Sequence, residues 1–138
     1  MNDKMKIYET LDDARDAGDA PWDQRLRDLS DYHVSVYQDR YPVTAGHLLF
    51  VPEYNTPGVL LDAFESALRY GESMVSRGEY DGYNIGFNSG TAAGQTVMYP
   101  HVHLIPRRHG DCENPIGGVR GVIPGQADYK AVDYKPSA

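Results

Sequence analysis

Hydrophobic and polar residues alternate along four stretches of the chain, and this side-chain period of two predicts β-strands. The first stretch places Val34 and Val36 on one face and Tyr37 on the other. The four expected strands are Tyr32–Asp39, Gly46–Pro52, Tyr83–Asn88 and Val97–Ile105. Because the connection around Pro42 is short, the first two strands should form an antiparallel pair.

Apolar residues spaced three and four positions apart predict helices elsewhere in the chain. The longest helix is expected at about 59–77, between the start signal Thr56-Pro57 and Gly78, a residue type that favours helix ends. Its core-facing stripe is predicted to be Leu61, Phe64, Leu68 and Val75. Shorter helices are expected at Leu11–Ala17 and Trp22–Leu29. This order of elements predicts an α+β fold, with a mainly antiparallel sheet of about five strands and one long helix packed on it.

The length of 138 residues is typical of one domain, and 41% of the residues are hydrophobic. We find no internal repeat or linker that divides the chain. A single domain is therefore expected over 1–138, with a helical N-terminal extension at 1–30 and an irregular C-terminal tail at 107–138.

The net charge of −7 changes the range of expected partners. Nucleic acids and anionic membranes need clustered Lys and Arg, so neither is an expected partner, whereas a small anionic ligand needs only a local set of donors. The one tight basic cluster, Arg107-Arg108-His109, either faces phosphates or lies in a solvated loop. Cys112 is the only cysteine, which excludes an internal disulfide and a multi-cysteine zinc site. With no long apolar segment or signal-peptide pattern, the expected location is cytoplasmic.

Candidate chemistry is concentrated at His101 and His103, which lie two residues apart after the small-residue loop that ends at Gly94. On a strand, both imidazoles would lie on one face together with Tyr99. One imidazole of such a pair can act as a nucleophile or base while the other donates to an anion. Pro100 has no N–H for a strand ladder, which disfavours a regular middle for this strand.

The segment Gly94–Arg107 resembles the signature of the histidine triad (HIT) family, G-Q-[ST]-V-x-H-x-H-x-H-x-x-P-R, with Tyr99 in place of the first histidine. Residues 41–52 and 83–90 resemble the strands that precede this signature, and 110–124 resembles a tail of some bacterial members. The resemblance covers roughly 32–124, and the first thirty residues match no known pattern. It implies a homodimer in which the two sheets join.

The resemblance also implies roles for single residues. His101 corresponds to the nucleophile that attacks the α-phosphorus, and its second nitrogen would donate to the backbone carbonyl of Tyr99. The implied partners in catalysis are His103, as a donor, and Gln95, at the phosphate. The implied substrate-binding residues are Thr96 at the phosphate, Asp39 at the ribose, Tyr37 beside the base, Asn88, and His47. For His47, a buried structural role is an equal alternative.

The favoured function is a nucleotide hydrolase that acts on a diadenosine polyphosphate, a nucleoside phosphoramidate or a similar conjugate, without a cofactor. A nucleotidyltransferase is one alternative, and a non-catalytic nucleotide-binding module, supported by Tyr99, is another. A metal site formed by His101, His103 and His47 is disfavoured, because the phosphate loop would then have no purpose. The structural zinc of some bacterial relatives is not expected either, since the chain lacks their Cys-x-x-Cys pair.

Overall fold

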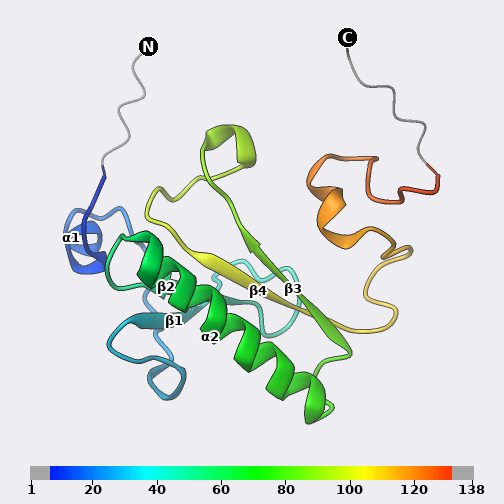
Figure 1. Cartoon of the computed structure of the whole chain (residues 1–138), viewed down its shortest axis with the longest axis horizontal. Coiled ribbons are helices and arrows are strands. Elements are labelled where there is room, and N and C mark those ends of the chain that lie inside the picture. Colours follow the sequence, from blue (N-terminus) through cyan, green and yellow to red (C-terminus); the bar gives the residue numbers. More distant parts are fainter. Residues whose placement is uncertain (1–6, 132–138) are drawn as a thin grey trace. The chain divides into compact units, whose positions relative to one another are not determined.

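The computed structural model describes residues 7–131, in which the chain up to Arg107 forms one compact unit and the chain from Arg108 forms another. The first unit contains the helices α1 (Leu11–Asp16) and α2 (Pro57–Ser76) and the strands β1 (Val34–Gln38), β2 (Leu48–Pro52), β3 (Gly82–Phe87) and β4 (Val102–Arg107). The second unit contains a 3-10 helix at Gly118–Val122. The expected α+β class, with one long helix on an antiparallel sheet, is confirmed (Figure 1).

The sheet has the strand order β1-β2-β4-β3, and each neighbouring pair is antiparallel (Figure 1). Within the described residues it has four strands rather than about five. The register places Leu49 opposite His103 and Ile85 opposite Leu104. The strand β4 therefore lies inside the sheet, with His103 near its N-terminal end and His101 directly before it.

One face of the sheet packs against α2. The helix begins where expected, because the Thr56 side chain accepts from the Val59 N–H and Pro57 occupies the first turn. The core between helix and sheet contains Val34, Val36, Leu48, Phe50, Ala63, Ala67, Tyr80, Val102 and Leu104. No helix within residues 7–131 combines the length and apolar character needed to cross a bilayer.

The predicted core stripe of α2 is largely wrong. Leu61, Leu68 and Val75 are 66%, 50% and 36% exposed, whereas Phe64 is partly buried against the core. The buried positions of the helix are the small residues Ala63, Ala67 and Gly71, which let the helix backbone approach the sheet closely. The larger apolar side chains, spaced seven residues apart, are consequently turned outward.

The opposite face of the sheet is partly covered by the N-terminal segment. The second core joins Leu11, Ala14, Ala20, Tyr37, Leu49, Val51 and Tyr99. The predicted helix Trp22–Leu29 is wrong except for a 3-10 turn at Arg27–Leu29. The open edge of β1 takes the backbone hydrogen bonds of this segment instead: Leu26 N–H donates to Val36 O (2.7 Å), and Gln38 N–H donates to Gln24 O (3.3 Å).

A substitution at Gly71 tests the close contact between α2 and the sheet. A Cβ at this position would lie 2.9 Å from the Tyr83 ring, so Gly71→Ala should lower the free energy of unfolding by about 1–3 kcal/mol. The matched control is Gly58→Ala in the same helix, where nothing lies within 4 Å of the added Cβ and the change should be neutral or slightly stabilising. Urea unfolding measures both variants, and equal stabilities would contradict the packing.

Candidate functional site

A pocket of about 330 Å³ opens on the face of the sheet that α2 does not cover, and this volume suits a small ligand. Five segments build its wall: the N-terminal segment, the loop after β1, the strand β2, the end of β3 with the following loop, and the start of β4. The lining residues are Pro21, Trp22, Asp39, Arg40, Tyr41, Leu49, Asn88, Gly94, Thr96, Val97, His101 and His103. The predicted residues Asp39, Asn88, Thr96, His101 and His103 are thus brought together.

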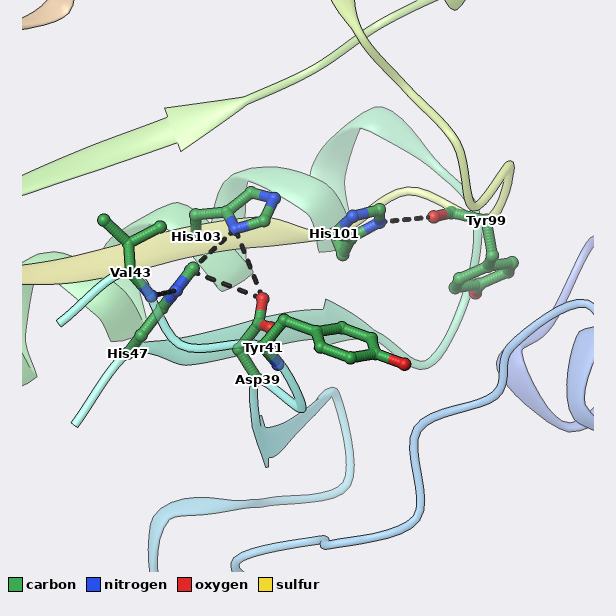
Figure 2. A network of polar contacts seen from close by, with 7 residues as sticks. All are labelled: Asp39, Tyr41, Val43, His47, Tyr99, His101 and His103. Carbon is green, nitrogen blue, oxygen red and sulfur yellow. Dashed lines mark hydrogen bonds and ion pairs between the residues drawn. The ribbon is translucent and has the colours of Figure 1, made fainter. Parts of the chain in front are cut away.

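The backbone before β4 is irregular, in agreement with the position of Pro100. The strand begins at Val102 rather than at Val97, so Tyr99 does not share a strand face with the two histidines. The Tyr99 side chain is 1% exposed, and its hydroxyl donates to the Pro52 carbonyl (2.7 Å). Only the main-chain carbonyl of Tyr99 faces His101 (Figure 2).

That carbonyl fixes the proton of His101. The distance from Nδ1 of His101 to the Tyr99 oxygen is 2.8 Å, and a carbonyl can only accept, so Nδ1 carries the hydrogen. In the neutral imidazole, Nε2 then holds a lone pair. Burial lowers the pKa of His101 and His103 lowers it further, against the opposing effects of the Tyr99 hydrogen bond and the Asp39 carboxylate. The geometry thus presents an unprotonated Nε2 at neutral pH.

A second chain of contacts sets the proton of His103 in the opposite way (Figure 2). Val43 N–H donates to Nδ1 of His47 (3.1 Å), so the proton of a neutral His47 is on Nε2. This Nε2 lies 2.9 Å from Nδ1 of His103 and 3.5 Å from Oδ2 of Asp39. His103 accepts at Nδ1 and therefore carries its own proton on Nε2.

The electrostatic environment keeps His47 and His103 neutral. Burial lowers the pKa of His47, and the nearby Asp39 carboxylate opposes this shift. Burial is also the largest cause of the lowered pKa of His103, followed by repulsion from His47. The rings of His101 and His103 have centroids 5.1 Å apart. Two adjacent imidazoles therefore differ in function, since one offers a lone pair and the other an N–H.

Asp39, His47 and His103 also have the composition of a metal site, because one ligand atom from each lies within 4.8 Å of the others. A metal would need a lone pair at Nε2 of His47, but the bond from Val43 N–H to Nδ1 places the proton there. The three residues thus fit a hydrogen-bond network better than a metal site. His101, which the sequence grouped with His47 and His103, does not belong to this trio.

Three predicted site residues do not line the pocket: Tyr37, Gln95 and His47, the last of which is buried in the hydrogen-bond network described above. Tyr37 is 0% exposed, and its hydroxyl accepts from Arg15 (3.3 Å), so contact with a nucleobase is wrong for this side chain. Gln95 does not line the pocket. Its side chain accepts from Gly90 N–H (2.8 Å) and donates to the carbonyls of Val97 and Met98, so it holds the loop together rather than presenting a free donor.

Trp22 forms an aromatic part of the pocket wall that was not predicted from the sequence. Its indole lies beside His101, with ring centroids 4.8 Å apart. The reason is the wrong helix prediction for Trp22–Leu29, in which Trp22 was assigned to the core together with Leu26 and Leu29 because of their spacing. The relevant signal was an aromatic residue after Pro21 in a segment with weak helical character.

Comparisons with known proteins show the family to which the chain belongs. The sequence model of the HIT domain matches residues 29–110. An uncharacterised HIT-like protein of Methanocaldococcus jannaschii is 36% identical over 89 residues, which are 60% of this chain and 69% of that protein. A zinc-bound histidine triad protein of Mycobacterium smegmatis has 32% identity and a TM-score of 0.60, over 74% of this chain and 77% of its own. The chain belongs to the HIT family.

Named enzymes also match. The bis(5'-nucleosyl)-tetraphosphatase of Schizosaccharomyces pombe is 35% identical over 77 residues, covering 51% of this chain and 42% of the enzyme. The adenylylsulfatase HINT3 of Arabidopsis thaliana is 31% identical over 81 residues, 54% of this chain and 41% of the enzyme. The chain thus spans less than half the length of these two relatives.

The proton positions of the three histidines are open to direct measurement. Long-range ¹H–¹⁵N NMR at neutral pH should find His101 protonated at Nδ1, and His47 and His103 protonated at Nε2. The variant His47→Ala removes the donor to His103 and should leave its tautomers mixed while that of His101 is unchanged. A lone pair at Nδ1 of His101 in the native protein would contradict the arrangement.

Proposed function

We propose that this protein is a nucleotide hydrolase in which His101 attacks the α-phosphorus of a nucleotide conjugate. The observation that carries the proposal is the pair of opposite tautomers in one pocket: the Nε2 lone pair of His101 beside the Nε2–H of His103. Substrates of this class include diadenosine polyphosphates and nucleoside phosphoramidates. The backbone groups that hold the two tautomers are supplied by Tyr99 and Val43.

In the first step, Nε2 of His101 forms a bond to the α-phosphorus as the bond from phosphorus to the leaving group breaks. The leaving group departs with the electron pair of that bond and takes a proton from solvent, while the Nε2–H of the neutral His103 donates a hydrogen bond that stabilises its developing charge. The imidazole of His101 becomes positively charged, and its Nδ1–H remains bonded to the Tyr99 carbonyl, which stabilises the charge. Water then attacks phosphorus, the bond from nitrogen to phosphorus breaks with its electron pair returning to Nε2 of His101, and the proton lost by the water passes to solvent.

The remaining pocket residues suit a nucleoside monophosphate group. Oδ1 of Asp39 accepts a hydrogen bond from the Tyr41 N–H (2.8 Å). The Asp39 carboxylate also lines the pocket, where ribose hydroxyls would donate to it. Thr96 and Asn88 offer a hydroxyl and an amide near the phosphate. Arg40 places a guanidinium on the wall, where Asp23 is its ion-pair partner (3.3 Å).

The named relatives support hydrolysis. Besides the tetraphosphatase and the adenylylsulfatase, similar proteins include a bis(5'-adenosyl)-triphosphatase of Dictyostelium discoideum and an adenosine 5'-monophosphoramidase of Saccharomyces cerevisiae. A transferase would use the same first step with another acceptor in place of water. The binding-module alternative loses its main support, because Tyr99 contributes a carbonyl to His101 while its side chain belongs to the core.

Substitution of the nucleophile tests the proposal. His101→Ala should abolish release of AMP from diadenosine polyphosphates and phosphoramidates, because no covalent intermediate can form. His103→Ala should be slower but active, since it removes one donor worth about 3–4 kcal/mol at most. Mass spectrometry of the native protein, quenched without acid during turnover, should find the nucleotidyl group on His101.

The control variant is Tyr99→Phe, which keeps the carbonyl beside His101 and removes only the hydroxyl that donates to Pro52. It should lose about 1 kcal/mol of stability and retain turnover. Full activity of a folded His101→Ala variant, or a nucleotidyl group on another residue, would reject the nucleophile. Binding of AMP without turnover of any conjugate would favour the binding module.

We also propose that the protein forms a homodimer. Among the described residues, β3 pairs with β4 alone and so has an open edge, and Leu61, Leu68 and Val75 form an exposed apolar stripe on α2. Light scattering should give about 31 kDa, twice the chain mass of 15.4 kDa. Leu68→Glu should shift the mass to the monomer, whereas Ser73→Glu, on an exposed part of α2 away from the stripe, should not. A monomeric native protein would reject the dimer.

A further inference from the structure

The active-site wall includes a side chain from outside the family domain. The HIT domain match begins at residue 29, whereas Pro21 and Trp22 line the pocket. Trp22 is the only tryptophan of the chain. Its ring centroid lies 4.8 Å from that of His101 at an interplanar angle of 59°, and 5.9 Å from that of Tyr37. The indole is thus packed between the proposed nucleophile and the second core.

Several contacts hold this segment at the pocket. Nη2 of Arg40 donates to the Pro21 carbonyl (3.2 Å) and lies 3.3 Å from Oδ2 of Asp23, so it holds the chain on both sides of Trp22. Further along, Leu26 N–H donates to Val36 O on the edge of β1. The backbone is therefore held on both sides of Trp22, and the ring contacts with His101 and Tyr37 place its indole at the pocket.

We propose that Trp22 is a positioning residue for His101: its indole holds the plane of the imidazole and excludes water from one side of it, so the N-terminal segment is part of the active site. The proposal deepens the function proposed above, since it takes His101 as the nucleophile. An apolar ring suits this position because the Tyr99 carbonyl already fixes Nδ1. Packing then restricts the remaining rotation of the imidazole without competing for Nε2.

Water exclusion has a measurable consequence at His101. The groups around this ring are His103 on β4, Asp39 and Arg40 in the loop after β1, and the uncharged indole of Trp22. Burial is the largest cause that lowers the pKa of His101. Without the indole, water reaches the imidazole and the charged form becomes less costly, so the pKa should rise toward its ordinary value. Protonation removes the lone pair, so the fall in activity at acid pH should move to higher pH.

The test is an NMR titration of the His101 imidazole in the native protein, Trp22→Ala and Trp22→Phe. Trp22→Ala should raise the pKa of His101 toward its ordinary value. It should also lower kcat by about ten- to a hundredfold with a fold that circular dichroism shows to be native. Trp22→Phe keeps an aromatic cover and should retain most of both properties.

A second variant tests how the segment is held and does not depend on Trp22→Ala folding. Arg40→Ala removes both contacts that flank Trp22, so the tryptophan fluorescence should shift to the red as the indole becomes hydrated. An unchanged His101 pKa in folded Trp22→Ala, or unchanged emission in Arg40→Ala, would overturn the proposal. The NMR titration and the fluorescence spectra can be recorded without turnover, so they test the role of Trp22 alone. Failure of the native protein to hydrolyse any nucleotide would instead reject the proposed function.

Discussion

The two-residue period of the inner strands is the constraint on which the rest of the structure depends. On β4, Val102 and Leu104 pack toward α2, and His103 between them is turned to the other face. On β2, Phe50 packs toward α2 and Leu49 lies on the side of the pocket. A residue inserted in either strand would exchange the two faces, sending core side chains to the pocket and His103 into the core. Packing and chemistry are therefore specified by the same alternation.

Backbone groups then determine which ring nitrogen of each histidine carries the proton. The Tyr99 carbonyl accepts from Nδ1 of His101, so the proton of His101 is on Nδ1. The Val43 N–H donates to Nδ1 of His47, so the proton of His47 is on Nε2, and the contact between His47 and His103 places the proton of His103 on Nε2 as well. Main-chain groups suit this task because their donor or acceptor character does not change with pH. Burial adds to the effect, since it disfavours the imidazolium forms in which both nitrogens would carry hydrogen.

Sequence alone predicted the elements whose signals are local. The start of α2 follows from Thr56 and Pro57, and the strands β1, β2 and β3 follow from their alternation. It failed where tertiary contacts decided the outcome. The segment after Trp22 pairs with the edge of β1 instead of forming a helix, and α2 packs through its small residues because close approach to the sheet outweighs the burial of Leu61 and Leu68. The histidines were found by motif, and the resemblance also implied the hydrogen bond from His101 to the Tyr99 carbonyl, but the tautomers of His47 and His103 required the structure.

Tyr99, which we interpret as standing in place of the first motif histidine, contributes to the site through its backbone alone. His101 needs an acceptor for Nδ1–H, and every residue type at position 99 supplies a carbonyl. The side chain is thereby free to serve the second core, where the Tyr99 hydroxyl satisfies the Pro52 carbonyl and its ring packs with Leu11 and Ala14. These partners belong to the N-terminal segment that also carries Trp22. The Tyr99 side chain thus ties that segment to the loop that precedes His101, the proposed nucleophile.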